Sequence, residues 1–317
     1  MGQTICSCAN PAFPVLGRPD CVLEMRAIAF PIIVPRFKAD GVTRNTIDLT
    51  SPTLGADIQE LIATSTALLE RIYPFPRCEN VSFERTETVY ETAPSTRKYK
   101  IPNVGGVRSF MFETWGKDAV HEILRQLKKI GCSDVDFFLV DVSGSFWGIL
   151  DNPTDTVMRG YEMATETFDA FKEYATDTTT QKLMISWDLD NSECEENSYG
   201  LSSEVLGYSA TTLRPLTPAY IKLVELDATT VQFNVIEADG SATGSPVVGL
   251  VASGATFAVN SDIDGAVALI PPVVETSDGV YSFPHADLDI TAGAIVTGEI
   301  TGASGYDIAN GSFTATL

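Results

Sequence analysis

The stretch FFLVDVSGSFWGIL, Phe137 to Leu150, decides the fold of the first part of this chain. Its apolar start leads into Asp141-Val142-Ser143-Gly144-Ser145, and a second apolar and aromatic run follows. Two structures fit this pattern. One is a magnesium-binding loop of the form D-x-S-x-S at the tip of a parallel strand, and the other is the tight turn of an antiparallel β-hairpin.

The residues after Ser145 favour the hairpin. The metal-ion-dependent adhesion site of von Willebrand A-type domains places D-x-S-x-S between a buried parallel strand and a helix. Here the residues after the turn are aromatic, β-rich and include a glycine, so they are a poor helix start. Gly144 can supply the positive φ angle that a tight turn requires. We therefore expect a hairpin, with a metal-dependent adhesin that uses Asp141, Ser143 and Ser145 as the alternative.

Clustered acids are the other candidates for chemistry. Asp188 with Asp190, and Glu193 with Glu195 and Glu196, could in principle do acid–base work. Acids at the end of a strand are more typical of a solvated edge, so we assign no catalytic role to them. A hydrolase is a distant alternative because the chain has no G-x-S-x-G elbow, and no phosphate-binding glycine pattern is present.

Metal sites have equally little support. Cys6, Cys8 and Cys21 could start a zinc site, but no second pair at C-x2-C spacing follows, and the histidines lie in unrelated contexts at positions 121 and 285. The run Asp262 to Gly265 lacks the fifth-position ligand and the closing glutamate of a calcium loop. The sequence therefore predicts no catalytic residue, no cofactor and no metal site.

Charge and hydropathy narrow the class of protein. The 317 residues carry a net charge of −21. The sequence has no basic stripe of the kind that attracts a phosphate backbone, so nucleic-acid binding is not expected. Apolar residues make up 44% of the chain, without an apolar run of membrane-spanning length or the pattern of a secretory signal. We expect a soluble protein that is made in a cytoplasm.

A change of composition near residues 209–219 marks a domain boundary. We place a β-rich assembly domain with two helices at 1–210 and an immunoglobulin-like domain at 219–317. The second part has short apolar runs between Asp-Gly and Asn-Gly turns, which predict a sandwich of about eight strands. The predicted strands are 220–226, 230–238, 246–252, 255–260, 266–274, 280–284, 294–300 and 312–317.

Apolar residues at three- and four-residue spacing predict two helices in the first part, at 56–72 and 117–130. The segments around them read as strands without regular strand–helix alternation. The predicted fold class is mainly β (α+β): an antiparallel β-sandwich or barrel with a packed helix, followed by a C-terminal immunoglobulin-like β-sandwich.

One part of the chain resembles tail-structure sequences of tailed bacteriophages. It consists of the segment VYETAPSTRKYKIPNVGGVRSF, a predicted helix, and the segment CSDVDFFLVDVSGSFWGIL. In particular, the order of elements is similar to that of a major tail tube protein, over about residues 20–205, with a surface-decorating domain over 220–317. The resemblance implies a non-enzymatic virion subunit whose hexameric rings stack into a tube around an acidic, DNA-conducting lumen. Its partners would be further copies of itself and other virion proteins, while DNA passes without specific binding. Capsid decoration, a connector ring or a head fibre are the alternatives.

Overall fold

The computed structural model divides into two compact units. The first contains residues 1–61, 69–119 and 124–214, and the second contains residues 62–68, 120–123 and 215–317. Strands account for 47% of the structure and helices for 11%, so the predicted mainly-β fold class is confirmed. The structure describes residues 23–317 apart from 64–65, 88–89, 93–97, 101–106, 117–120, 131–132, 153, 191–192, 194–196, 227–229, 239–243, 268–272, 285–294, 302, 304, 309–312 and 317.

The larger sheet of the first unit is built around β8, whose side chains are buried along its whole length. β8 pairs antiparallel with β1 and β9, and the path of strands is β2-β10-β9-β8-β1-β3, with β11 on β8 and β14 on β9. The strands are β1 (Ile28–Pro35), β2 (Thr46–Asp48), β3 (Tyr73–Pro74), β8 (Val135–Asp141), β9 (Phe146–Ile149), β10 (Val157–Arg159), β11 (Tyr161–Glu162) and β14 (Ser198–Leu201).

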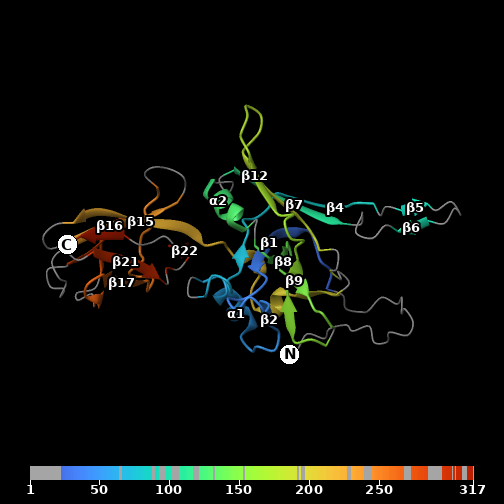
Figure 1. The fold of residues 1–317 in the computed structure, drawn as a ribbon, viewed down its shortest axis with the longest axis horizontal. Helices are drawn as coiled ribbons and strands as arrows, with labels where there is room; N and C mark the ends of the chain where they lie inside the picture. Colours follow the sequence, from blue (N-terminus) through green and yellow to red (C-terminus); the bar gives the residue numbers. More distant parts are fainter. Residues whose placement is uncertain are drawn as a thin grey trace. The chain divides into compact units, whose positions relative to one another are not determined.

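A second, four-stranded antiparallel sheet has the order β12-β13-β7-β4. Its strands are β4 (Asn80–Arg85), β7 (Arg108–Trp115), β12 (Asp169–Glu173) and β13 (Lys182–Asp188). β4 and β7 continue into a two-stranded ladder of β5 (Tyr90–Thr92) and β6 (Lys98–Lys100) that extends away from this sheet (Figure 1).

Aromatic side chains hold the two sheets of the first unit together. The Phe137 ring on β8 lies 4.9 Å from the Trp187 ring and 5.2 Å from the Phe110 ring, which belong to β13 and β7. Phe112 stacks on Trp187 at 5.0 Å. Burying such side chains contributes about 1.5–3 kcal/mol each, so this cluster is a main source of the unit's stability.

The helices of the first unit only partly follow the prediction. The second predicted helix is confirmed as α2 (His121–Ile130), with Leu127 buried, while residues 117–120 of the prediction lie outside the described residues. Helix α1 (Leu54–Glu60) is much shorter than predicted, because the chain turns back so that the Ile72 N–H donates to the Leu61 carbonyl at 3.0 Å. The sequence ATST at 63–66 explains the error, since serine and threonine hydroxyls compete for backbone hydrogen bonds. A four-residue helix α3 (Ser203–Leu206) and a 3₁₀ helix η3 (Ala210–Thr212) follow later in the chain.

The second unit has two sheets, in the orders β19-β20-β16-β15-β22 and β18-β17-β21-β23. If β15, β16, β17, β18, β19, β20, β21 and β23 are read as A, B, C, C′, D, E, F and G, the sheets become DEBA and C′CFG, the arrangement of an immunoglobulin-like sandwich. The strands are β15 (Thr217–Leu226), β16 (Thr230–Glu237), β17 (Thr256–Ser261), β18 (Gly265–Val267), β19 (Val274–Ser277), β20 (Val280–Pro284), β21 (Ile295–Thr301), β22 (Tyr306–Asp307) and β23 (Phe313–Thr316).

The predicted strand at 246–252 is wrong. After one bridge between Pro246 and Ile236, the chain turns at Gly249, whose φ angle is +76°. The turn is fixed from elsewhere, because the Gly249 N–H donates to Glu275 Oε2 at 2.9 Å and the Leu250 N–H donates to the Tyr281 hydroxyl at 3.2 Å. Strong apolar character in this run therefore reflects a loop packed on the core.

Candidate functional site

The stretch from Phe137 to Leu150 is a β-hairpin of β8 and β9. Val140 pairs with Phe146 across the turn, and the Gly144 N–H donates to the Asp141 carbonyl at 3.0 Å. Gly144 has a φ angle of +86°, and the Asp141 N–H donates to the Ser145 carbonyl at 3.1 Å. This is a three-residue loop closed by a left-handed glycine, one of the common hairpin connections. The predicted hairpin is confirmed.

The Asp141 carboxylate is the centre of this turn and is fully buried. One oxygen accepts hydrogen bonds from the Ser143 amide at 2.9 Å, the Ser143 hydroxyl at 2.6 Å and the Ser145 amide at 3.0 Å. The other accepts from Trp147 Nε1 at 3.0 Å and the Arg26 amide at 3.3 Å. Burial raises the pKa of Asp141, but these hydrogen bonds outweigh it, so the pKa lies below its ordinary value.

This geometry gives the D-x-S-x-S pattern a structural role. Both carboxylate oxygens of Asp141 are occupied by protein donors, and a strand begins at Phe146 where an adhesion site requires a helix. Across the described part of the chain, no group of three or more His, Cys, Asp or Glu residues is arranged to hold a metal ion. The hydrogen bonds of the aspartate hold the turn in this conformation.

The turn also fastens the segment that leaves the first unit. The Ala210 N–H donates to the Gly144 carbonyl at 2.9 Å, and a Cβ at position 144 would lie 2.2 Å from the Ser209 hydroxyl oxygen. Glycine is therefore required at position 144 for two reasons, its positive φ angle and this close approach.

The acidic candidates are engaged in structure as well. Asp188 accepts a hydrogen bond from the Ser109 hydroxyl at 2.6 Å. Glu193 pairs with Arg159 at 2.7 Å, and its carboxylate also accepts a hydrogen bond from the Glu162 amide at 2.7 Å. The Asp190 amide donates to the Glu162 carbonyl at 2.9 Å. These acids tie loops to strands.

Several other candidates fall outside the described residues: Cys6, Cys8, Cys21, Glu195, Glu196 and His285. Of the remaining candidates, Asp264 accepts a hydrogen bond from the Ser261 hydroxyl at 2.9 Å within a turn, and His121 is the first residue of α2.

The sequence patterns did not predict a partly buried ion network in the first unit. Arg36 Nε lies 2.9 Å from Asp136 Oδ1, and its Nη1 lies 2.7 Å from Glu162 Oε1. Arg44 bridges the same two acids at 3.0 and 2.9 Å. Burial raises the pKa of Asp136 while the two arginines act in the opposite direction. The partners are about a hundred residues apart, so no local sequence signal could have revealed the network.

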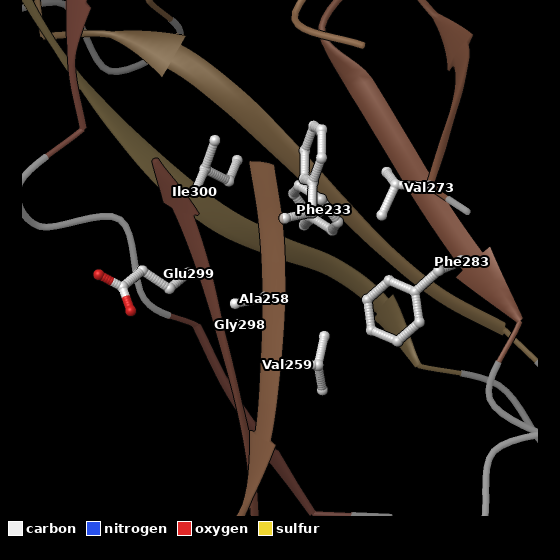
Figure 2. Close-up of a pocket in the computed structure, with 9 residues that line it drawn as sticks. Phe233, Ala258, Val259, Val273, Phe283, Gly298, Glu299 and Ile300 are labelled. Atoms are coloured by element: carbon white, nitrogen blue, oxygen red, sulfur yellow. The ribbon is translucent and has the colours of Figure 1, made fainter. Parts of the chain in front are cut away.

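A hollow in the second unit is too small for a ligand. Figure 2 shows a hollow between the two sheets of the second unit, beside Phe233, Val259, Phe283 and Ile300. Its volume is about 10 Å³. That is the space of a single water molecule, and the mostly apolar side chains around it offer few hydrogen-bond partners.

The four-stranded sheet of the first unit has one face that points away from the aromatic core, which we call the outer face. It is defined by the pairing register, because directly opposite residues in a ladder point to the same side. Its residues are Asn80, Ser82, Glu84, Ser109, Met111, Glu113, Trp115, Asp169, Phe171, Glu173, Lys182, Met184, Ser186 and Asp188. Five are acidic and one is basic, which gives the face a net charge of −4.

Large apolar side chains lie among these acids. Met111 is 36% exposed, Trp115 44% and Phe171 38%. Lys182 Nζ lies 4.8 Å from the centre of the Trp115 ring and 3.6 Å from Glu113 Oε2, while Trp115 Nε1 donates to the same oxygen at 3.1 Å. The outer face therefore combines acidic groups with exposed apolar surface.

Both edges of this sheet are open within the described residues. β4 and β12 each pair with one neighbour, β7 and β13 respectively. On β4, the Phe83 ring points toward the core and packs edge-on against Phe110 at 5.1 Å, yet it is 52% exposed. Its exposure arises because no further strand lies beside it.

None of the helices in the described part of the chain is long and apolar enough to cross a membrane. Comparison of the chain with protein-family models, with curated proteins and with solved structures found no match.

Proposed function

We propose that this chain is a non-enzymatic structural subunit of a tailed-bacteriophage virion, most simply a tail tube protein. Its copies form hexameric rings that stack around an acidic channel for DNA. It is made in the host cytoplasm and resides in the virion tail. Its partners are further copies of itself and other virion proteins.

The observation that carries the proposal is the open four-stranded sheet. Its strands alternate in direction, so the outermost strands β12 and β4 run in opposite directions. When copies are repeated around an axis, β4 of one copy therefore meets β12 of the next copy in the antiparallel sense, with every outer face on the same side. Closure removes the exposed edges, and it covers the half-exposed ring of Phe83.

The charge of the outer face supports placing it toward the channel. A net charge of −4 on each copy would be repeated around the ring. Such a surface repels a phosphate backbone and lets DNA pass without adhering. The immunoglobulin-like unit decorates the outside in this proposal, because its two-sheet core is complete in itself.

Negative-stain microscopy of the purified chain tests the proposal. We expect rings or tubes for the unaltered protein, and dispersed particles for Phe83→Asp, which places a charge at the open edge. Val42→Asp is the matched control, since Val42 is an 80% exposed apolar residue on a turn of the same unit. Tryptophan fluorescence in both variants establishes that the unit remains folded.

A stable monomer of the unaltered chain at high concentration would refute the proposal. A closed oligomer that never stacks would instead move the protein to another position in the virion, such as capsid decoration, a connector or a head fibre.

A further inference from the structure

We propose that the outer face of the four-stranded sheet binds a basic, amphipathic helix of another protein. The inference rests on the proposed function in one respect only: in a ring this face lines the channel, so the partner would be enclosed there. Binding itself needs no ring, because one copy carries the complete face.

Exposed apolar side chains are the first argument. A surface that only keeps DNA away needs acids, and apolar groups add nothing to that task. Met111 and Trp115 on β7 and Phe171 on β12 nevertheless lie exposed on this face. Aromatic residues and methionine are the side chains enriched where proteins bind one another. Their presence points to a protein partner.

Charge determines the chemistry of that partner. The only basic group of the face, Lys182, is already held by Glu113 and the Trp115 ring. Glu84, Asp169 and Glu173 are exposed acids of the same face. They attract cationic side chains and repel nucleic acid. A partner with lysine or arginine beside apolar residues complements both properties.

Size and hydrogen bonding favour a helix. Four strands span roughly 14 Å from the first to the last, enough for one helix of about 10–12 Å diameter. The inner strands β7 and β13 have neighbours on both sides, so a partner lying across them meets side chains rather than free backbone groups. Methionine and aromatic side chains on acidic surfaces adapt to the apolar stripe of basic amphipathic helices.

Titration calorimetry of the full chain with a synthetic Leu/Lys helix of about 18 residues tests the inference, since that length matches the eight-residue strand β7. We expect the double variant Met111→Ser/Phe171→Ser to bind at least about tenfold more weakly, and Asp169→Asn/Glu173→Gln to lose a similar factor. The matched controls are the double variants Val42→Ser/Val205→Ser and Glu60→Gln/Glu204→Gln, which alter exposed residues elsewhere on the same unit. Both controls should bind the peptide with an affinity within about twofold of that of the unaltered chain.

The inference is overturned by equal weakening in the controls, which would mean general attraction to an acidic protein. It is also overturned if the peptide fails to bind, or if single-stranded DNA binds in its place. A third contrary result is that the face variants abolish ring formation while no variant or unaltered chain binds the peptide, which would assign the face to a second copy. Peptide binding by a chain that forms no rings would refute the proposed function and leave this inference standing.

Discussion

Replacing Asp141 with alanine should destabilise the first unit strongly. The variant leaves two buried donors, the Trp147 indole N–H and the Ser145 amide, without their acceptor. An unsatisfied buried donor costs roughly 1–3 kcal/mol, so we expect a loss of about 4 kcal/mol in the free energy of unfolding. Asp141→Asn retains one acceptor oxygen and should lose about half as much.

Urea unfolding followed by tryptophan fluorescence is the assay. All three tryptophans, Trp115, Trp147 and Trp187, belong to the first unit, so the signal reports on that unit alone. Ser143→Ala is the control. It removes one hydroxyl bond but retains the Ser143 amide bond to the carboxylate, and it should cost only about 1 kcal/mol.

Lowering the pH should remove the stabilisation that the Asp141 carboxylate gives to the folded first unit. Its pKa is lower in the folded state than in the unfolded state, so the folded protein binds fewer protons. The stabilisation is therefore fully present above the unfolded pKa of about 3.9, and it is lost as the pH falls through the folded value. The unaltered chain and Asp141→Ala should converge in stability over that range.

Two results would refute the reasoning about this turn. One is a loss below about 1 kcal/mol in Asp141→Ala, the size of a single neutral hydrogen bond. The other is a rise in the stability of the unaltered chain with added magnesium that disappears in the variant, because a ligand that binds only the folded state stabilises it.

Three further predictions concern single positions. Gly144→Ala should lower the free energy of unfolding by about 2 kcal/mol or more, because it combines a left-handed φ angle with a clash against Ser209, and urea midpoints would measure this. Arg159→Met should cost about 3–5 kcal/mol in the same assay, since it leaves the buried Glu193 carboxylate without its cation. Burial raises the pKa of the Cys78 thiol to about 12, so peptide mass spectrometry should find it unmodified after iodoacetamide treatment at about pH 8 without denaturant.

The sequence predicts those parts of the fold that depend on neighbouring residues. The hairpin at Asp141 could be read because Gly144 and the flanking apolar runs act within a few residues of one another. The strands of the immunoglobulin-like unit could be read for the same reason, since Asp264-Gly265 and Asp278-Gly279 mark its turns.

The errors arise where a local pattern competes with another force. Leu68 and Leu69 fit the periodicity of the first predicted helix, but they are 57% and 48% exposed in a turn. The predicted strand at 246–252 has the right composition, but Glu275 and Tyr281 hold its backbone in a loop. In the second case, hydrogen bonds to residues 26 and 31 positions away decide the conformation.

The outer face could not be predicted, because it depends on which strands meet and in which register. Phe171 and Met184 share a side only through the pairing of β12 with β13, and Met111 joins them through β7. A shift of one residue in either ladder would send these side chains into the core.

The bond between Ala210 and Gly144 decides how tension enters the first unit. A pull on the chain at Arg214 is carried first by η3 and then by the β8–β9 turn to which η3 is fastened. β8 lies in the interior of its sheet, with neighbours on both sides. Through this turn, a pull at Arg214 reaches β8 and β9, which both have strand neighbours on two sides, before it reaches an outermost strand of the sheet.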